Sequence, residues 1–244
     1  TKEIETTKDV PLDKLIEQYP DSALLFAKRG RINLEKQDFI HAYSDASTAF
    51  RLDSTDNVVE KLYADVLNNR PERSVADVYV AQRHFQNLLS KDGKNTELLV
   101  AVASTFSQQQ DFEKAFSYIN SALKIDPRFR DAYIMKGSIY RVLGNTELMK
   151  SSYETAIQQD PECFEAYIML GVIYQSDEDP ICIQYFETAM ELLPGNSEAF
   201  YSLAYAKQHF GKEDEALEML EEALRLDPSF SDGYEAVGVM LGRS

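Results

Sequence analysis

The chain has 244 residues, of which 44% are apolar and 27% are charged, a composition typical of folded globular proteins. Its formal net charge of −16 disfavours contact with a phosphate backbone or an anionic membrane, so we expect no nucleic-acid partner. The two cysteines exclude a disulfide scaffold, and no apolar run approaches the roughly 18 residues of a membrane-spanning helix, so we expect no membrane insertion by this segment.

The first 22 residues predict a tether followed by one helix. Residues 1–10 are rich in Lys, Glu and Thr and predict a flexible lead-in. In residues 11–22, Leu12, Leu15 and Ile16 precede Pro20, which predicts a lone helix that forms half a repeat.

From residue 23 onward the sequence repeats with a period near 34. Small residues recur at Gly30, Ala64, Ala103, Gly137, Gly171, Ala204 and Gly238, and two further series, ending at Ala223 and at Pro228, keep the same intervals. The repeat predicts copies at 23–56, 57–95, 96–129, 130–163, 164–196 and 197–230, with a capping helix at 231–244.

Each copy predicts two helices and a proline stop. In the fourth copy, Tyr133, Gly137 and Tyr140 fall on one helical stripe, and a second stripe follows the turn signal at Gly144. That stripe ends before Pro161, because proline lacks the amide hydrogen that a helix needs. The small residues are expected to let neighbouring helices approach closely.

Two copies depart from the pattern. The second copy carries Glu60 where other copies have an aromatic or aliphatic residue, and its connection between helices is five residues longer. That loop contains Arg70 and Arg73, and we weigh two interpretations: ordinary drift in a loop, or a contact element. Ser74 is expected to cap the helix that follows, with Asp77 three residues on.

With its repeats in place, the sequence resembles the tetratricopeptide repeat family. The matching segments include "DAYIMKGSIYRVLGNTELMKSSYETAIQQDP" and "EAFYSLAYAKQHFGKEDEALEMLEEALRLDP", and the resemblance covers about residues 23 to 241. It implies an all-α fold, a right-handed superhelical solenoid of antiparallel helix pairs. It also implies that ligands lie along the concave groove formed by the first helix of each copy.

The sequence contains no recognisable catalytic or metal-binding motif. No Gly-rich phosphate loop, H-E-x-x-H or Cys-x-x-Cys is present, and His41, His84 and His209 fall at non-equivalent places. We therefore expect no enzymatic activity, no metal and no cofactor. Cys163 and Cys182 fall near opposite ends of a predicted helix, which is too far apart for a disulfide, so we expect two free thiols.

One face of the first helices is expected to line the groove and bind a partner. Its residues lie six and three before the small residue and one and four after it, and several are apolar where a solvated face would be polar. From the third copy onward the residues six before are acidic, which suits the first turn of a helix, and we favour that role over ligand binding. The predicted partner-binding residues are Lys61, Asn68, Val100, Ser104, Ile134, Ser138, Arg141, Ile168, Val172, Gln175, Tyr201, Tyr205 and Gln208.

These residues favour a protein or peptide partner with an apolar or amphipathic segment. Residues 164–244 carry 16 acids and four bases, a net charge of −12, so a basic part of the ligand would be attracted there. Only Lys61 suits the carboxylate clamp of the family's chaperone-binding members, so that activity is disfavoured. Alternatively, the apolar residues cover one another or bury against a second copy of the chain, which leaves a homodimer open.

The sequence therefore predicts a non-enzymatic protein-interaction scaffold. Two alternatives remain: a regulatory or sensor region of a larger enzyme or signalling protein, and a self-associating structural protein. The chain begins at Thr1, and its Thr-, Lys- and Glu-rich start, Tyr-rich helices and acidic composition are loosely similar to those of bacterial repeat lipoproteins. We therefore expect a lipid-anchored location in the cell envelope after removal of a signal, with a cytoplasmic location as the alternative.

Overall fold

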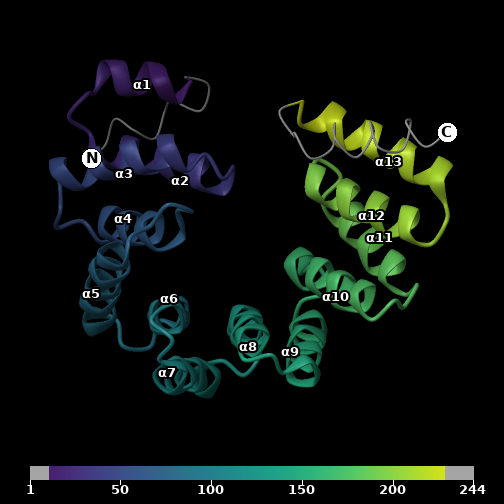
Figure 1. Cartoon of the computed structure of the whole chain (residues 1–244). Coiled ribbons are helices and arrows are strands. Elements are labelled where there is room, and N and C mark those ends of the chain that lie inside the picture. The colour runs from purple at the N-terminus through teal and green to yellow at the C-terminus, as the bar shows by residue number, and fades with distance from the viewer. Residues whose placement is uncertain (1–10, 229–244) are drawn as a thin grey trace. The chain divides into compact units, whose positions relative to one another are not determined.

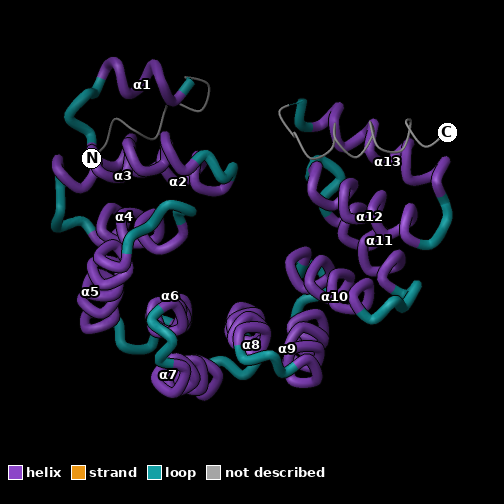
Figure 2. Tube along the Cα trace, viewed as in Figure 1, coloured by secondary structure: helices purple, strands orange, loops and turns teal. Residues whose placement is uncertain are grey.

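The computed structural model describes residues 11–228, so the predicted lead-in 1–10 and capping helix 231–244 lie outside the described residues. Figure 2 shows that the described chain consists of helices and loops, without a strand. The chain divides into two compact units, residues 1–127 and 128–244. Within each unit, consecutive helices pack as pairs (Figure 1).

The described part of the first unit begins with one short helix, and the described parts of both units then repeat a two-helix motif. Unit 1 comprises α1 (Leu12–Gln18), α2 (Ala23–Glu35), α3 (Phe39–Leu52), α4 (Asn57–Asn69), α5 (Val75–Lys91), α6 (Thr96–Gln108) and α7 (Phe112–Ile125). The described part of unit 2 comprises α8 (Arg130–Val142), α9 (Thr146–Gln159), α10 (Phe164–Ser176), α11 (Cys182–Leu192), α12 (Ser197–His209) and α13 (Glu213–Leu226). We call the even-numbered helices from α2 to α12 the first helices and their partners the second helices.

Most turns within a pair use the same backbone device. One residue adopts a left-handed conformation, and the next amide donates to a carbonyl five residues back, as Asn145 does to Tyr140 at 2.9 Å. The left-handed residues are Gln37, Gln110, Gly144, Glu178 and Gly211. This turn satisfies the last carbonyls of the first helix and reverses the chain within three residues.

The turn between α4 and α5 is built differently. Residues 70–74 form a longer loop that contains no left-handed residue. Ser74 and Asp77 form the predicted capping box, in which each side chain accepts a hydrogen bond from the backbone amide of the other residue. The sequence prediction for this helix start is therefore confirmed.

The core depends on small residues where two helices cross. A Cβ atom at Gly137 would lie 2.7 Å from the ring of Tyr153, and one at Gly171 would lie 2.5 Å from the ring of Phe186. Because real Cβ atoms do not approach other carbons so closely, glycine is needed where α8 packs on α9 and α10 packs on α11. Both rings are almost completely buried.

Candidate interaction site

In unit 1 the residues on the first-helix face form an ion-pair ladder. We define the first-helix face by the residues three before, one after and four after the small residue of each first helix. Arg31 of α2 donates to Asp65 of α4 at 2.7 Å, and Lys61 lies 3.1 Å from the same carboxylate. Lys61 also lies 3.9 Å from Glu97 of α6, so the ladder spans three successive first helices.

A second row of polar contacts joins α4 to α6. Asn68 donates to Ser104 at 3.1 Å and accepts a hydrogen bond from Gln108 at 2.7 Å. Asn68 is only 4% exposed, so its predicted role as an accessible groove residue is wrong. The sequence spacing identified the correct helix face, but α6 covers Asn68 and uses its amide. The polar groups on this face of unit 1 are therefore bonded to one another.

In unit 2 the same face carries exposed apolar and aromatic side chains. Val172 of α10 is 43% exposed and Tyr205 of α12 is 54% exposed. The equivalent positions in unit 1 hold the polar residues Arg31, Asp65 and Ser104. Arg141 is also exposed. The remaining predicted residues with partial exposure are Ile134, Ser138, Gln175, Tyr201 and Gln208 in this unit, and Lys61, Val100 and Ser104 in unit 1.

Ile168 is the exception in unit 2. The sequence placed it on the groove surface, but it is 4% exposed and belongs to a core cluster with Cys182, Phe186 and Leu203. That prediction is wrong, because α12 packs directly against α10 and covers the position. The alternative interpretation, in which some apolar residues on this face cover one another, describes Ile168 correctly.

The accessible residues of this face in unit 2 have polar neighbours with unused capacity. Glu165 and Glu198, in the first turns of α10 and α12, are exposed and form no ion pair within residues 11–228. Carboxylates in a first turn are stabilised by the helix dipole, and here they also leave a free negative charge beside the apolar residues.

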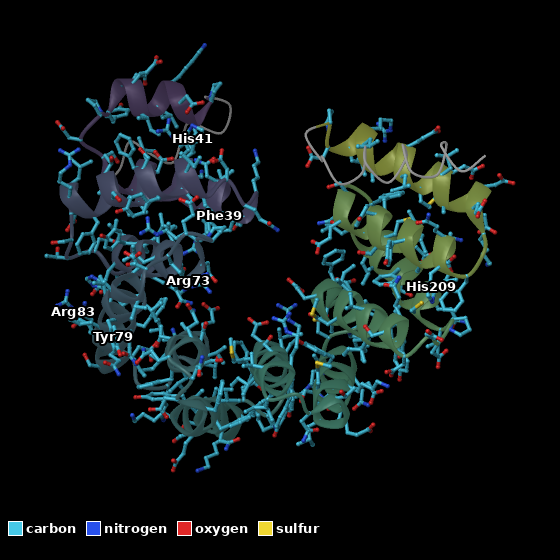
Figure 3. The ribbon with its side chains drawn as sticks, viewed as in Figure 1. Phe39, His41, Arg73, Tyr79, Arg83 and His209 are labelled. Carbon is cyan, nitrogen blue, oxygen red and sulfur yellow. The ribbon has the colours of Figure 1, made fainter. Side chains whose placement is uncertain are left out.

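The α4–α5 loop forms one wall of a pocket in unit 1. The pocket has a volume of about 470 Å³ and lies between this loop and the α2–α3 turn. Figure 3 labels Arg73 of the loop and Phe39, which follows the turn. Ile40, which lines it, is 81% exposed. The Arg70 guanidinium lies 4.5 Å from the centre of the Tyr43 ring and pairs with Asp77, so its charge is already used within the protein.

Sequence reasoning missed a buried polar cluster around Glu60. The Glu60 side chain is 5% exposed and accepts hydrogen bonds from Asn87 at 2.8 and 3.0 Å. His84 Nδ1 lies 3.0 Å from the same carboxylate, and Lys91 Nζ lies 3.3 Å from it. The signal was present: His84, Asn87 and Lys91 share one stripe of the helix that follows the unusual glutamate.

Elsewhere, the side chains that could react or bind a metal lie apart from one another. Cys163 and Cys182 are unpaired and buried, and burial raises the pKa of the Cys163 thiol to about 11. In residues 11–228, His, Cys, Asp and Glu side chains nowhere gather in a group that could hold a metal ion. In the same residues, no helix has the length and apolar character needed to cross a membrane.

The comparisons with known proteins agree with this architecture. The tetratricopeptide repeat model matches residues 96–129, 131–163 and 197–230. No curated protein sequence matches the chain. Among solved structures, a chain of the APC/C hetero-tetramer Cut9–Hcn1 aligns over 94% of this chain with a TM-score of 0.65 and 12% identity. This chain spans only 45% of that one.

Two further structures align over most of their own length. PilF from Pseudomonas aeruginosa has a TM-score of 0.58 and 14% identity, and the alignment covers 89% of this chain and 96% of PilF. YrrB has a TM-score of 0.50 and 19% identity, with 78% and 96% covered. At these identities the likeness concerns the fold alone. The family model shows tetratricopeptide repeats in the three matched segments, and the likeness to solved structures shows an all-helical solenoid fold.

Proposed function

We propose that this chain is a non-enzymatic scaffold that binds a segment of a partner protein on the first-helix face of unit 2. One observation carries the proposal: Val172 and Tyr205 are 43% and 54% exposed at a repeat position where unit 1 has only polar residues, each of them bonded within the unit. Exposed apolar residues on a regular helical face favour burial against another protein, and tyrosine is enriched at such interfaces.

The chemistry of the face favours an amphipathic segment with basic side chains. Ile134, Val172, Tyr201 and Tyr205 offer the apolar contacts. Glu165 and Glu198 add carboxylates that no described cation neutralises. A lysine or arginine beside the apolar residues of the ligand would pair with these carboxylates and accelerate encounter.

The first-helix face of unit 1 is a poor second half for this site. A ligand there would have to displace the Arg31–Asp65–Lys61 ladder or the Asn68–Gln108 hydrogen bond before gaining its own contacts. Exchanging one bonded partner for another yields little net free energy. We therefore assign unit 1 a supporting role. The YrrB structure, described as a TPR protein with an unusual peptide-binding site, offers a precedent for peptide binding on this fold.

The proposal is tested by affinity capture with a surface variant and a matched control. Val172→Glu/Tyr205→Glu introduces two charges at exposed positions of unit 2. We expect recovery of the partner to fall at least about tenfold, because buried interface positions tolerate no unpaired charge. Circular dichroism checks that the variant remains folded.

The control is Ile40→Glu/Tyr79→Glu in unit 1, where the residues are 81% and 55% exposed and lie outside the first-helix face. This variant carries the same chemical change and should retain every partner. If the unit 2 variant stays folded and also retains every partner, the proposed face is wrong. If capture recovers only a second copy of this chain, the scaffold is a self-associating one.

A further inference from the structure

A pocket opens beside the first-helix face of unit 2, between α8, α9 and α10. It has a volume of about 270 Å³ and is lined by Arg141, Thr146, Met149, Tyr153, Met169, Val172, Ile173, Ser176 and Asp177. Tyr153 and Ile173 are buried at its base, whereas Arg141, Thr146, Val172 and Ser176 are exposed. Val172 belongs both to this pocket and to the first-helix face, so the two surfaces are continuous.

The size and lining suit one bulky apolar side chain. A cavity of about 150 Å³ lined by aliphatic groups is sufficient to hold a benzene molecule, so this pocket has room for a phenyl, indole or long aliphatic group. Met149 and Met169, both partly buried, contribute flexible and polarisable walls that adapt to different shapes. Tyr153 and Ile173 supply a floor that is already packed and rigid.

Two charged side chains lie at the opening of the pocket, and only one of them is paired within the protein. Asp177 is neutralised by Lys150, whose Nζ lies 2.6 Å from the carboxylate and 4.5 Å from the centre of the Tyr174 ring. Arg141 is exposed and forms no ion pair within residues 11–228. The opening therefore presents one free guanidinium in a unit that is otherwise acidic, and guanidinium pairs best with a carboxylate.

We propose that this pocket is an anchor site for the partner, which inserts a bulky apolar side chain and places an Asp or Glu side chain on Arg141. The inference rests on the proposed function and specifies its ligand. The partner segment is bipolar: its anchor and acidic residue lie at the pocket, and its basic residues reach toward Glu165 and Glu198. A cation in the last turn of α8 also suits the helix dipole, but that role sets no preference in a ligand.

The test uses random peptides displayed at the N-terminus of a phage coat protein and selected on the full chain. Such peptides have no free C-terminus, so any carboxylate that binds Arg141 is a side chain. We expect the enriched sequences to share a bulky apolar residue with an Asp or Glu within about four residues, the spacing of one helical turn. Synthetic copies are then measured by fluorescence anisotropy.

Two variants separate the two features of the pocket. Ser176→Trp, at an exposed position on the rim, fills the pocket with its own indole and should weaken the selected peptides at least about tenfold. Arg141→Glu should weaken them to a similar degree and, when selection is repeated, should enrich Lys or Arg in place of the acid. Lys212→Glu makes the same charge change at an exposed turn of unit 2 and should leave affinity within about twofold.

The outcomes separate this inference from the proposed function. If the selected peptides lose affinity for Val172→Glu/Tyr205→Glu but bind Ser176→Trp and Arg141→Glu normally, the anchor site is wrong and the first-helix face stands. If they bind all of these variants normally, or if no peptide is enriched, both proposals are wrong. Circular dichroism of each variant shows whether it is folded, and an unchanged acid preference in an Arg141→Glu reselection overturns the role of Arg141.

Discussion

The two units use one helical architecture but differ in the groups that they bury and expose. Three carboxylate residues among the described ones are buried, and all three, Asp45, Glu60 and Asp65, lie in unit 1. Each is held by neighbouring cations or amides, as when Arg29 donates to Asp45 at 2.7 and 2.9 Å. Unit 2 instead buries both thiols and leaves apolar and tyrosine side chains exposed on its first-helix face.

The difference shows how repeats of one fold acquire separate roles. A face whose polar groups bond to one another stabilises the solenoid and has little capacity for a ligand. A face that exposes apolar residues next to free charges contributes less to its own stability and retains the capacity to bind. The buried thiols also make Cys163 and Cys182 a probe that reports on unit 2 alone.

The largest predicted loss of stability comes from a substitution that tests whether a position of unit 2 belongs to the binding face or to the core. Ile168→Glu places a charge among the buried apolar side chains of Cys182, Phe186 and Leu203. We expect it to lower the free energy of unfolding by about 3–5 kcal/mol, the cost of an unpaired buried charge. Urea unfolding followed through the reactivity of the two thiols measures this in unit 2.

The matched control is Val172→Glu, four residues further along α10 and 43% exposed. It should change the stability by less than about 1 kcal/mol, because its carboxylate remains in water. Equal destabilisation by the two substitutions would contradict the distinction between the two positions.

An intermediate effect concerns the sensitivity of unit 1 to acid. Burial raises the pKa of Glu60, but hydrogen bonds involving His84, Asn87 and Lys91 outweigh it and hold the pKa below the ordinary value of a glutamate. Because the folded pKa is the lower one, this carboxylate stabilises unit 1 fully above about pH 5, and the stabilisation is lost as the pH falls through the folded pKa. Unit 1 should therefore unfold before unit 2 on acidification.

Circular dichroism and an acid-tolerant thiol reagent measure this order together. We expect part of the helicity to disappear while Cys163 and Cys182 remain protected. Glu60→Gln should cost about 2–3 kcal/mol at neutral pH, as expected for hydrogen bonds to a charged group, and should reduce the loss of stability in acid. Glu35→Gln, at an exposed position of α2 in unit 1, is the control. Exposure of the thiols in the first acid transition would refute the predicted order.

The smallest effect concerns the ladder on the first-helix face of unit 1. Asp65→Asn keeps the shape of the side chain but removes the charge that Arg31 and Lys61 share. Because both cations are partly exposed, we expect a loss of about 1–2 kcal/mol in a urea titration. Asp21→Asn, on an exposed loop, should have no measurable effect. A neutral or stabilising result for Asp65→Asn would show that the ladder contributes nothing to unit 1.

Much of the architecture can be predicted from the sequence, because the same helix-pair pattern recurs in each copy of the repeat. Small residues at Gly137 and Gly171 predicted close helix crossings, and the structure shows an aromatic ring too close to each glycine to admit a Cβ atom. The capping box of Ser74 was also predictable, because it depends on residues only three apart. Such features are local or periodic, so they require no knowledge of how helices pack across the chain.

The accessibility of the face was decided by the tertiary structure. Ile168 and Val172 lie one turn apart on the same helix and read alike in the sequence, yet α12 covers the first and leaves the second exposed. Asn68 is covered in the same way by α6, and the pocket beside Arg141 arises only because three helices converge. Helical spacing determines which side of a helix a residue occupies. The packing angle and reach of neighbouring helices determine whether that residue meets solvent, and no period in the sequence encodes them.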